Sequence, residues 1–133
     1  MSALEVIQPA GWVRPRGYSN GIVGEGRVLF MGGMVGWDPT NPTPTFAPTF
    51  AAQWDQALSN VVAVLREAGG RPEQLTRLTV YVVDKKEYLA ALKELGASWQ
   101  KHLGRHYPAM ALVQVVALVE DAAKVEIEGT AVL

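Results

Sequence analysis

The spacing of apolar residues changes several times along the 133-residue chain and divides it into expected strands and helices. Near the start, the β-prone runs at 18–23 and 27–31 flank Gly24-Glu25-Gly26. Two such runs around a glycine-rich turn predict a hairpin. Gly32 and Gly33 then follow, and we expect them to end the second strand.

Two later segments have the three- and four-residue spacing of amphipathic helices. The first begins at Thr49 and stops at Gly69-Gly70. Its apolar stripe consists of Phe50, Trp54, Ala57, Leu58, Val61, Leu65 and Ala68. The second follows Asp84, a capping residue, and ends at Gly104 with Pro108 close behind. Its stripe consists of Tyr88, Leu92, Leu95 and Trp99, and Gly96 weakens its centre.

The remaining regular segments are predicted strands. Residues 78–83 alternate with a period of two, and 125–133 place Glu126, Glu128 and Thr130 on one face. Residues 109–119 are apolar apart from Gln114, which favours a strand covered on both faces. A small monomer has too little mass to cover both, so we expect a subunit interface. The whole pattern predicts one α+β domain over residues 1–133, with a mixed sheet and two helices on one of its faces.

Composition narrows the possible functions. Apolar residues make up 49% of the chain and charged residues 19%, which indicates a folded core. The net charge of -1 and the scattered basic residues argue against nucleic acid as a partner. The chain has no cysteine, no signal-like start and no apolar run of the ~18 residues that a membrane helix needs. We therefore expect a cytoplasmic protein without a membrane partner.

The sequence gives little reason to expect a metal or cofactor. His102 and His106 are four residues apart, but Gly104 lies between them and no HExxH motif accompanies them. The glycines of 21–26 match neither GxGxxG nor a P-loop. The segment Asp38–Pro48, with four prolines and three threonines, predicts an irregular loop that is a candidate wall or lid of a site.

Several short motifs occur together in a recognisable order. They are Tyr18-Ser19-Asn20, Gly32-Gly33, Ala68-Gly69-Gly70, TVYVVD at 79–84, His106-Tyr107-Pro108-Ala109 and VEIE at 125–128. The ordered set resembles the RidA/YjgF/YER057c/UK114 family of small trimeric imine and enamine deaminases. The resemblance implies a chorismate-mutase-like fold and a homotrimer with active sites in the clefts between subunits.

The resemblance also assigns roles to individual positions. Glu126 matches the family's water-activating glutamate, Tyr18 its tyrosine, and Gly32-Gly33 its Ser-Gly turn. Met34 stands where a glutamine often follows, and Met110 stands where the family has an arginine that binds the substrate's carboxylate. A thioether cannot form that ion pair, so the resemblance implies altered specificity.

Each of these positions also has a purely structural interpretation. Glu126 is the catalytic candidate, but a half-buried carboxylate can also have the purely structural role of binding an amide or a lysine. Glu128, two residues further on and on the same face, is the second candidate for the catalytic role. Tyr18 either binds substrate or anchors its strand. Trp37 either lines the cleft or packs beside the proline loop. Arg14, Arg16 and Arg105 lie near matched motifs and are candidates to replace the missing arginine.

Two functions from different classes follow. The first is a homotrimer that binds a small molecule between its subunits and hydrolyses a reactive imine or enamine, with Glu126 orienting water. The second is a non-catalytic binding or regulatory trimer that kept the scaffold. A third function, an endoribonuclease or translation inhibitor, is disfavoured by the charge balance and by the absence of a basic aromatic strip.

Overall fold

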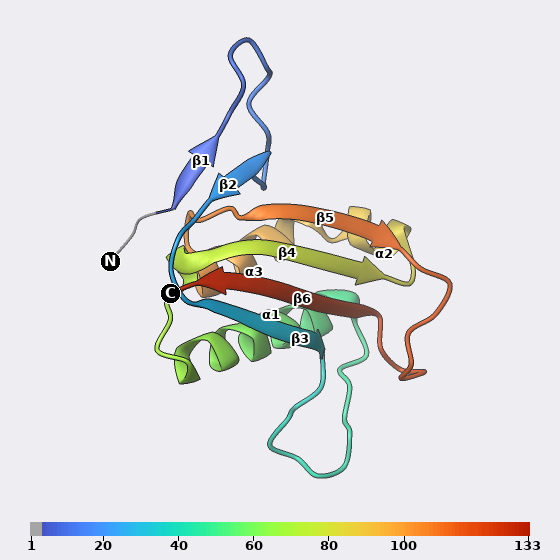
Figure 1. Ribbon diagram of the computed structural model, residues 1–133. Helices are drawn as coiled ribbons and strands as arrows, with labels where there is room; N and C mark the ends of the chain where they lie inside the picture. Colours follow the sequence, from blue (N-terminus) through green and yellow to red (C-terminus); the bar gives the residue numbers. More distant parts are fainter. Residues whose placement is uncertain (1–3) are drawn as a thin grey trace.

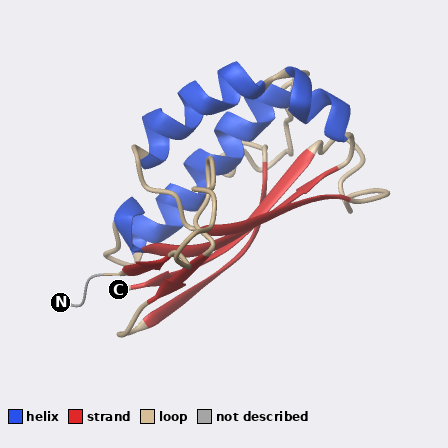
Figure 2. Ribbon diagram, turned by 90° about the horizontal axis from the view of Figure 1, so that it is seen from above, coloured by secondary structure: helices blue, strands red, loops and turns tan. Residues whose placement is uncertain are grey.

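The fold is a twisted four-stranded sheet with helices packed on one face only. The computed structural model describes residues 4–133. The main sheet has the order β3-β6-β4-β5, with β3 Val28–Val35, β6 Val125–Val132, β4 Leu75–Val82 and β5 Ala109–Gln114. β4 and β5 run parallel and the other neighbours antiparallel, so the sheet is mixed as expected. The helices cover one face, and the opposite face is free of helices (Figure 2).

The first helix, α1 Phe50–Glu67, forms as its sequence predicts. The Thr49 hydroxyl accepts a hydrogen bond from the amide of Ala52 at 3.2 Å, which satisfies one of the free amides of the first turn. At the other end Gly69 adopts a positive φ of 83°, and the Gly70 amide bonds the Leu65 carbonyl at 2.9 Å. The apolar stripe is buried against the sheet and forms the centre of the core.

The second helical segment is divided in two, so the structure has three α-helices rather than the predicted two. α2 Lys85–Ala90 and α3 Leu92–Leu103 meet at Ala91, whose φ of -109° and ψ of 11° interrupt the helix. The Asp84 carboxylate caps α2 as expected, accepting from the Lys86 amide at 2.9 Å. The change of direction lets Tyr88 reach the ring of Trp54, with centroids 6.0 Å apart, while α3 packs along α1.

The predicted N-terminal hairpin is wrong. β2 Gly21–Val23 pairs with β1 Glu5–Ile7 in a separate two-stranded sheet, whereas β3 pairs with β6. The segment 24–26 carries the chain from one sheet to the other, and the C-terminus closes over it, since the Leu133 amide bonds the Arg27 carbonyl at 2.8 Å. In Figure 1, β1, β2 and the loop between them project beyond the β5 edge of the main sheet.

Two other strand boundaries differ from expectation. β3 continues through Gly32-Gly33 to Val35, because a register shift between Met31 and Met34 accommodates the two glycines within the strand. β5 ends at Gln114, and Val116 and Val119 beyond it are fully exposed. Ala111 and Val113 on the open face of β5 are exposed, so within one chain this strand is not covered on both faces.

The last strand, β6, follows the predicted alternation. Val125, Ile127 and Ala131 are buried against the helices. Glu126, Glu128 and Thr130 are half-buried and point to the open face. This face therefore carries the two carboxylates that the sequence singled out.

Candidate functional site

The Glu126 carboxylate lies directly over Gly33 on the open face of the sheet. A Cβ atom built on Gly33 would meet Cδ of Glu126 at 2.8 Å and Oε1 at 2.9 Å, so the contact requires glycine. β6 and β3 are neighbours, and Glu126 is in register with Val35. Within residues 4–133, no hydrogen bond or ion pair holds this carboxylate. It is thus positioned beside exposed backbone and free to bind water or a ligand.

The rival carboxylate, Glu128, has a partner. The Tyr81 hydroxyl donates a hydrogen bond to its Oε1 at 2.5 Å. This hydrogen bond, followed by burial and the negative charges of Glu128 and Glu126, raises the pKa of Tyr81 above its ordinary value. Glu128 is therefore engaged in a cross-strand pair, whereas Glu126 has no such partner within residues 4–133.

Met110 lies on the other face of the sheet. It is in register with Leu78, whose side chain is fully buried, and it packs against the core beneath α2 and α3. There it lines a cavity of about 320 Å³ together with aromatic side chains from three helices, Trp54, Tyr88 and Trp99. Burial raises the pKa of Tyr88 above its ordinary value. Met110, which the resemblance matches to the family's arginine, thus forms part of the wall of an apolar cavity.

Tyr18 lines a second, adjoining cavity of about 590 Å³ with Arg14 and Arg105. Gly17 and Tyr107 border both cavities. The neighbour of Tyr18 fixes the segment in place, because the Ser19 amide bonds the Pro108 carbonyl at 3.0 Å. The Tyr18 side chain is 41% exposed, so it is not a buried anchor of its strand.

The other two predicted residues, Met34 and Trp37, lie neither at the Glu126 carboxylate nor in the linings of the cavities at Met110 and Tyr18. Met34 is in register with buried Ile127 and packs towards the helices, not towards the Glu126 carboxylate. Trp37 stacks at a tilt on Phe46 of the proline loop, with ring centroids 5.9 Å apart. Its carbonyl accepts a hydrogen bond from Asn60 at 3.0 Å. Both residues stabilise the segments that hold β3.

One chain therefore contains two separate halves of the predicted site. Gly33 and Glu126 lie on the open face near the β3 edge, whereas Met110 and Tyr18 lie near the β5 edge. The two edges are the opposite ends of one sheet (Figure 1). A site that uses both halves has to draw them from two subunits.

Sequence reasoning missed the cavity around Met110. Trp54, Tyr88 and Trp99 were assigned to apolar helix stripes, which is correct, but part of each ring faces this space. The one signal for the cavity was Gly96, an unfavourable residue in the middle of a helix, which also lines it.

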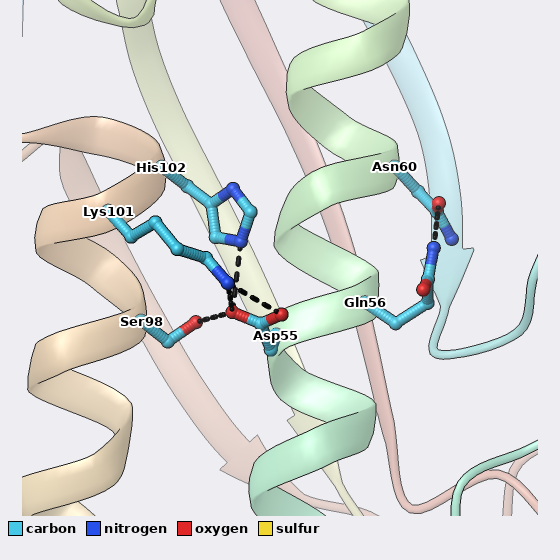
Figure 3. A network of polar contacts seen from close by, with 6 residues as sticks. All are labelled: Asp55, Gln56, Asn60, Ser98, Lys101 and His102. Carbon is cyan, nitrogen blue, oxygen red and sulfur yellow. Dashed lines mark hydrogen bonds and ion pairs between the residues drawn. The ribbon is translucent and has the colours of Figure 1, made fainter.

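A polar network on the helix layer links α1 to α3 (Figure 3). Oδ1 of Asp55 forms hydrogen bonds with the Ser98 hydroxyl at 2.8 Å and with Nε2 of His102 at 3.0 Å. Nζ of Lys101 donates to Oδ2 at 3.1 Å and lies 2.9 Å from Oδ1 as an ion pair. Burial acts to raise the pKa of Asp55, but the hydrogen bonds from Lys101, Ser98 and His102 outweigh it, and the pKa is lowered. Serine and histidine both bind the carboxylate here and not each other, so the network is not a nucleophile with its base.

Both histidines have partners within the chain. His102 binds Asp55, and His106 bonds the Leu75 carbonyl at 2.6 Å. Across residues 4–133 no group of three or more histidine, aspartate or glutamate side chains could hold a metal ion. In the same part of the chain, no helix has the length and apolar character needed to span a membrane.

Comparisons with known proteins agree with this architecture. The sequence model of the Endoribonuclease L-PSP family matches residues 13–133. A RutC family protein of Synechocystis sp. is 31% identical over 130 residues, which is 98% of this chain and 97% of the relative. The 2-iminobutanoate/2-iminopropanoate deaminase of Escherichia coli is 32% identical over 108 residues, 80% of each chain.

Among solved structures, the Rid family protein YyfB of Yersinia pestis, described as of unknown function, superposes with a TM-score of 0.86. It is 30% identical, with 99% of this chain and 100% of that one covered. The chain therefore belongs to the Endoribonuclease L-PSP family, the same RidA/YjgF family that its ordered motifs resemble.

Proposed function

We propose that this chain assembles as a homotrimer whose inter-subunit clefts bind a small molecule and hydrolyse a reactive imine or enamine. The observation that carries the proposal is the partner-free Glu126 carboxylate, which lies over Gly33 on the face that no helix covers. The deaminase relatives in E. coli support the reaction class.

The separation of the two half-sites supports an assembly of more than one copy, and the family resemblance supports three. Head-to-tail contacts between identical subunits form a closed ring when the rotation between copies closes. A ring that places the β5 edge of one subunit against the β3 edge of the next brings Met110 and Tyr18 towards the partner's Glu126. The open face of the sheet, which includes Phe30 at 79% exposure, is then covered by neighbouring copies.

The reaction needs only water and a base. Glu126 accepts a proton from a water molecule as the water oxygen forms a bond to the imine carbon, and it returns the proton to nitrogen. Glu126 then takes the hydroxyl proton of the tetrahedral intermediate and passes it to nitrogen, so that the carbon–oxygen double bond forms as the carbon–nitrogen bond breaks and ammonia leaves. Tyr18 and the amides beside Gly33 hold the reacting group.

The competing function is a binding trimer without catalysis. Met34 and Met110 favour it, because both pack against the core and neither offers a polar group to a substrate. Endoribonuclease activity, which the family description names, has less support from a chain with a net charge of -1.

The test is ammonia release from freshly generated 2-imino acids and neutral imines by the native protein, Glu126→Gln and Glu128→Gln. We expect Glu126→Gln to lower the rate roughly 10²–10⁴-fold, the usual contribution of general acid–base catalysis. The matched variant Glu128→Gln should retain the rate within a few-fold. Undiminished turnover in Glu126→Gln would exclude this mechanism, and no turnover of any imine by the native protein would favour the binding trimer.

A further inference from the structure

The cavity beside Met110 has the size and lining of a site for a bulky apolar group. Its volume of about 320 Å³ is at the lower end of the range for small-molecule sites. Aromatic and aliphatic side chains form most of its wall, among them Trp54, Tyr88, Leu95 and Trp99. Trp99 is fixed by stacking on Tyr107, with the two rings 6.0 Å apart and inclined by only 8°. The wall is therefore largely preformed.

Gly96 keeps this cavity open. It lies within α3 and lines the cavity, and a Cβ atom built on it would meet nothing within 4 Å. Its φ is not in the positive range, so the backbone does not require glycine here. Glycine in a helix interior is less stable than alanine. A small residue at this position leaves the space of the cavity open.

A positive charge stands at the edge of the same cavity. Arg16 lines it, and Arg14 and Arg105 line the adjoining cavity across Gly17 and Tyr107. Within residues 4–133, none of these three guanidinium groups forms an ion pair with a carboxylate. Guanidinium groups bind carboxylates through paired hydrogen bonds. A ligand bound in the apolar cavity thus has a guanidinium group at the rim of the cavity with which its own carboxylate can pair.

We infer that the cavity is a side-chain subsite and that Arg16 supplies the carboxylate partner that Met110 cannot. The ligand class is a small carboxylic acid with an aromatic or bulky aliphatic side chain. This inference rests on the proposed function for the reaction itself: the substrate is then the 2-imino form of such an acid, with its imine carbon between Arg16 and the partner's Glu126. Binding, by contrast, requires no catalysis.

The experiment measures binding by titration calorimetry, with the trimeric state of each variant checked first. The probes are phenylpyruvate, pyruvate and the neutral 3-phenylpropanamide. We expect the native protein to bind phenylpyruvate at least roughly tenfold more tightly than either of the others, because only phenylpyruvate fills the cavity and also pairs with Arg16. Equal affinity for all three probes, or no binding, would overturn the inference.

Two pairs of variants locate the contacts. Arg16→Gln should weaken phenylpyruvate binding roughly tenfold or more, whereas Arg66→Gln, an exposed arginine at the end of α1, should not. Gly96→Leu should fill the cavity and abolish binding, whereas Gly96→Ala should retain most of it and raise the melting temperature. Native affinity in Arg16→Gln or in Gly96→Leu would refute the assignment.

The two proposals can fail separately. Glu126→Gln should abolish imine hydrolysis without abolishing phenylpyruvate binding, because the subsite and Arg16 contact the side chain and carboxylate of the probe. If native protein binds the probe through Arg16 but turns over no imine, the subsite stands and the proposed deaminase activity fails. If it hydrolyses imines but Arg16→Gln and Gly96→Leu bind phenylpyruvate normally, the subsite fails and the activity stands.

Discussion

The contact between Gly33 and the Glu126 carboxylate can be tested by adding a single methyl group. In Gly33→Ala the new Cβ would lie 2.8 Å from Cδ and 2.9 Å from Oε1 of Glu126, whereas ordinary contacts are 3.4–4 Å. For an ordinary contact the carboxylate must therefore move away by about 0.6 to 1.2 Å. Misplacement of a catalytic group by about 1 Å can cost about 10²-fold in rate.

We expect Gly33→Ala to lower kcat/KM for imine hydrolysis roughly tenfold to a hundredfold. The fold should be little affected, because the obstructing atoms are the end of a flexible side chain and Gly33 has no positive φ. Gly32→Ala is the matched control, since a Cβ at Gly32 meets nothing within 4 Å, and its rate should stay within about threefold of native.

The assay is ammonia release, with melting temperature and trimer mass measured on the same preparations. An unchanged rate in Gly33→Ala, alongside loss of activity in Glu126→Gln, would show that the reacting carboxylate does not lie over Gly33. Equal damage from both alanines would point to disturbance of the β3 bulge instead. Either result would refute the reasoning from this contact.

Three further predictions concern stability and specificity. The pKa of Asp55 is lowered in the folded protein, so the stabilisation by its charge is complete above the ordinary pKa near 3.9 and is lost as the pH falls below it. In urea unfolding, Asp55→Asn should therefore be about 1 kcal/mol less stable than the native protein at pH 7 and nearly equal to it at about pH 2. In the same assay Gln53→Leu should lower the free energy of unfolding by about 3 kcal/mol, because three backbone groups, including the Lys124 amide at 2.8 Å, lose their hydrogen-bond partner. The control Gln56→Leu should lower it by less than about 1 kcal/mol. Met110→Arg should raise ammonia release from short 2-imino acids at least roughly thirty-fold, and an unchanged rate would contradict the alignment of Met110 with the family's arginine.

The elements that local sequence determines were predicted correctly. α1 has its cap at Thr49 and its stop at Gly69-Gly70, and β6 alternates strictly, because helix ends and side-chain period depend on residues near in sequence. The pairing of β2 and β3 was wrong because strand partners are chosen by the whole fold, and β6 competes for the position beside β3. The break at Ala91 was not predicted because no proline or glycine marks it in the sequence.

The site was predictable only in part for a similar reason. The proximity of Gly33 to Glu126 depends on the register between β3 and β6 after the bulge, which no local pattern specifies. The resemblance identified both residues without placing them. It also grouped Met110 with Glu126, which a single chain holds on opposite faces of its sheet. The cavity was missed because a residue that packs in a core and one that lines a hollow have the same helical spacing.

The separation of Glu126 from Met110 and Arg16 has a genetic consequence in the proposed trimer. Two variant chains, Glu126→Gln and Arg16→Gln, would each give homotrimers of lowered activity, yet each supplies the half that the other lacks. Refolding an equal mixture should restore activity, because each half of a cleft is native with a probability of one half, so about a quarter of the clefts regain both. Such complementation occurs only when one active centre is shared between chains, and it can be scored without knowing the arrangement of the subunits.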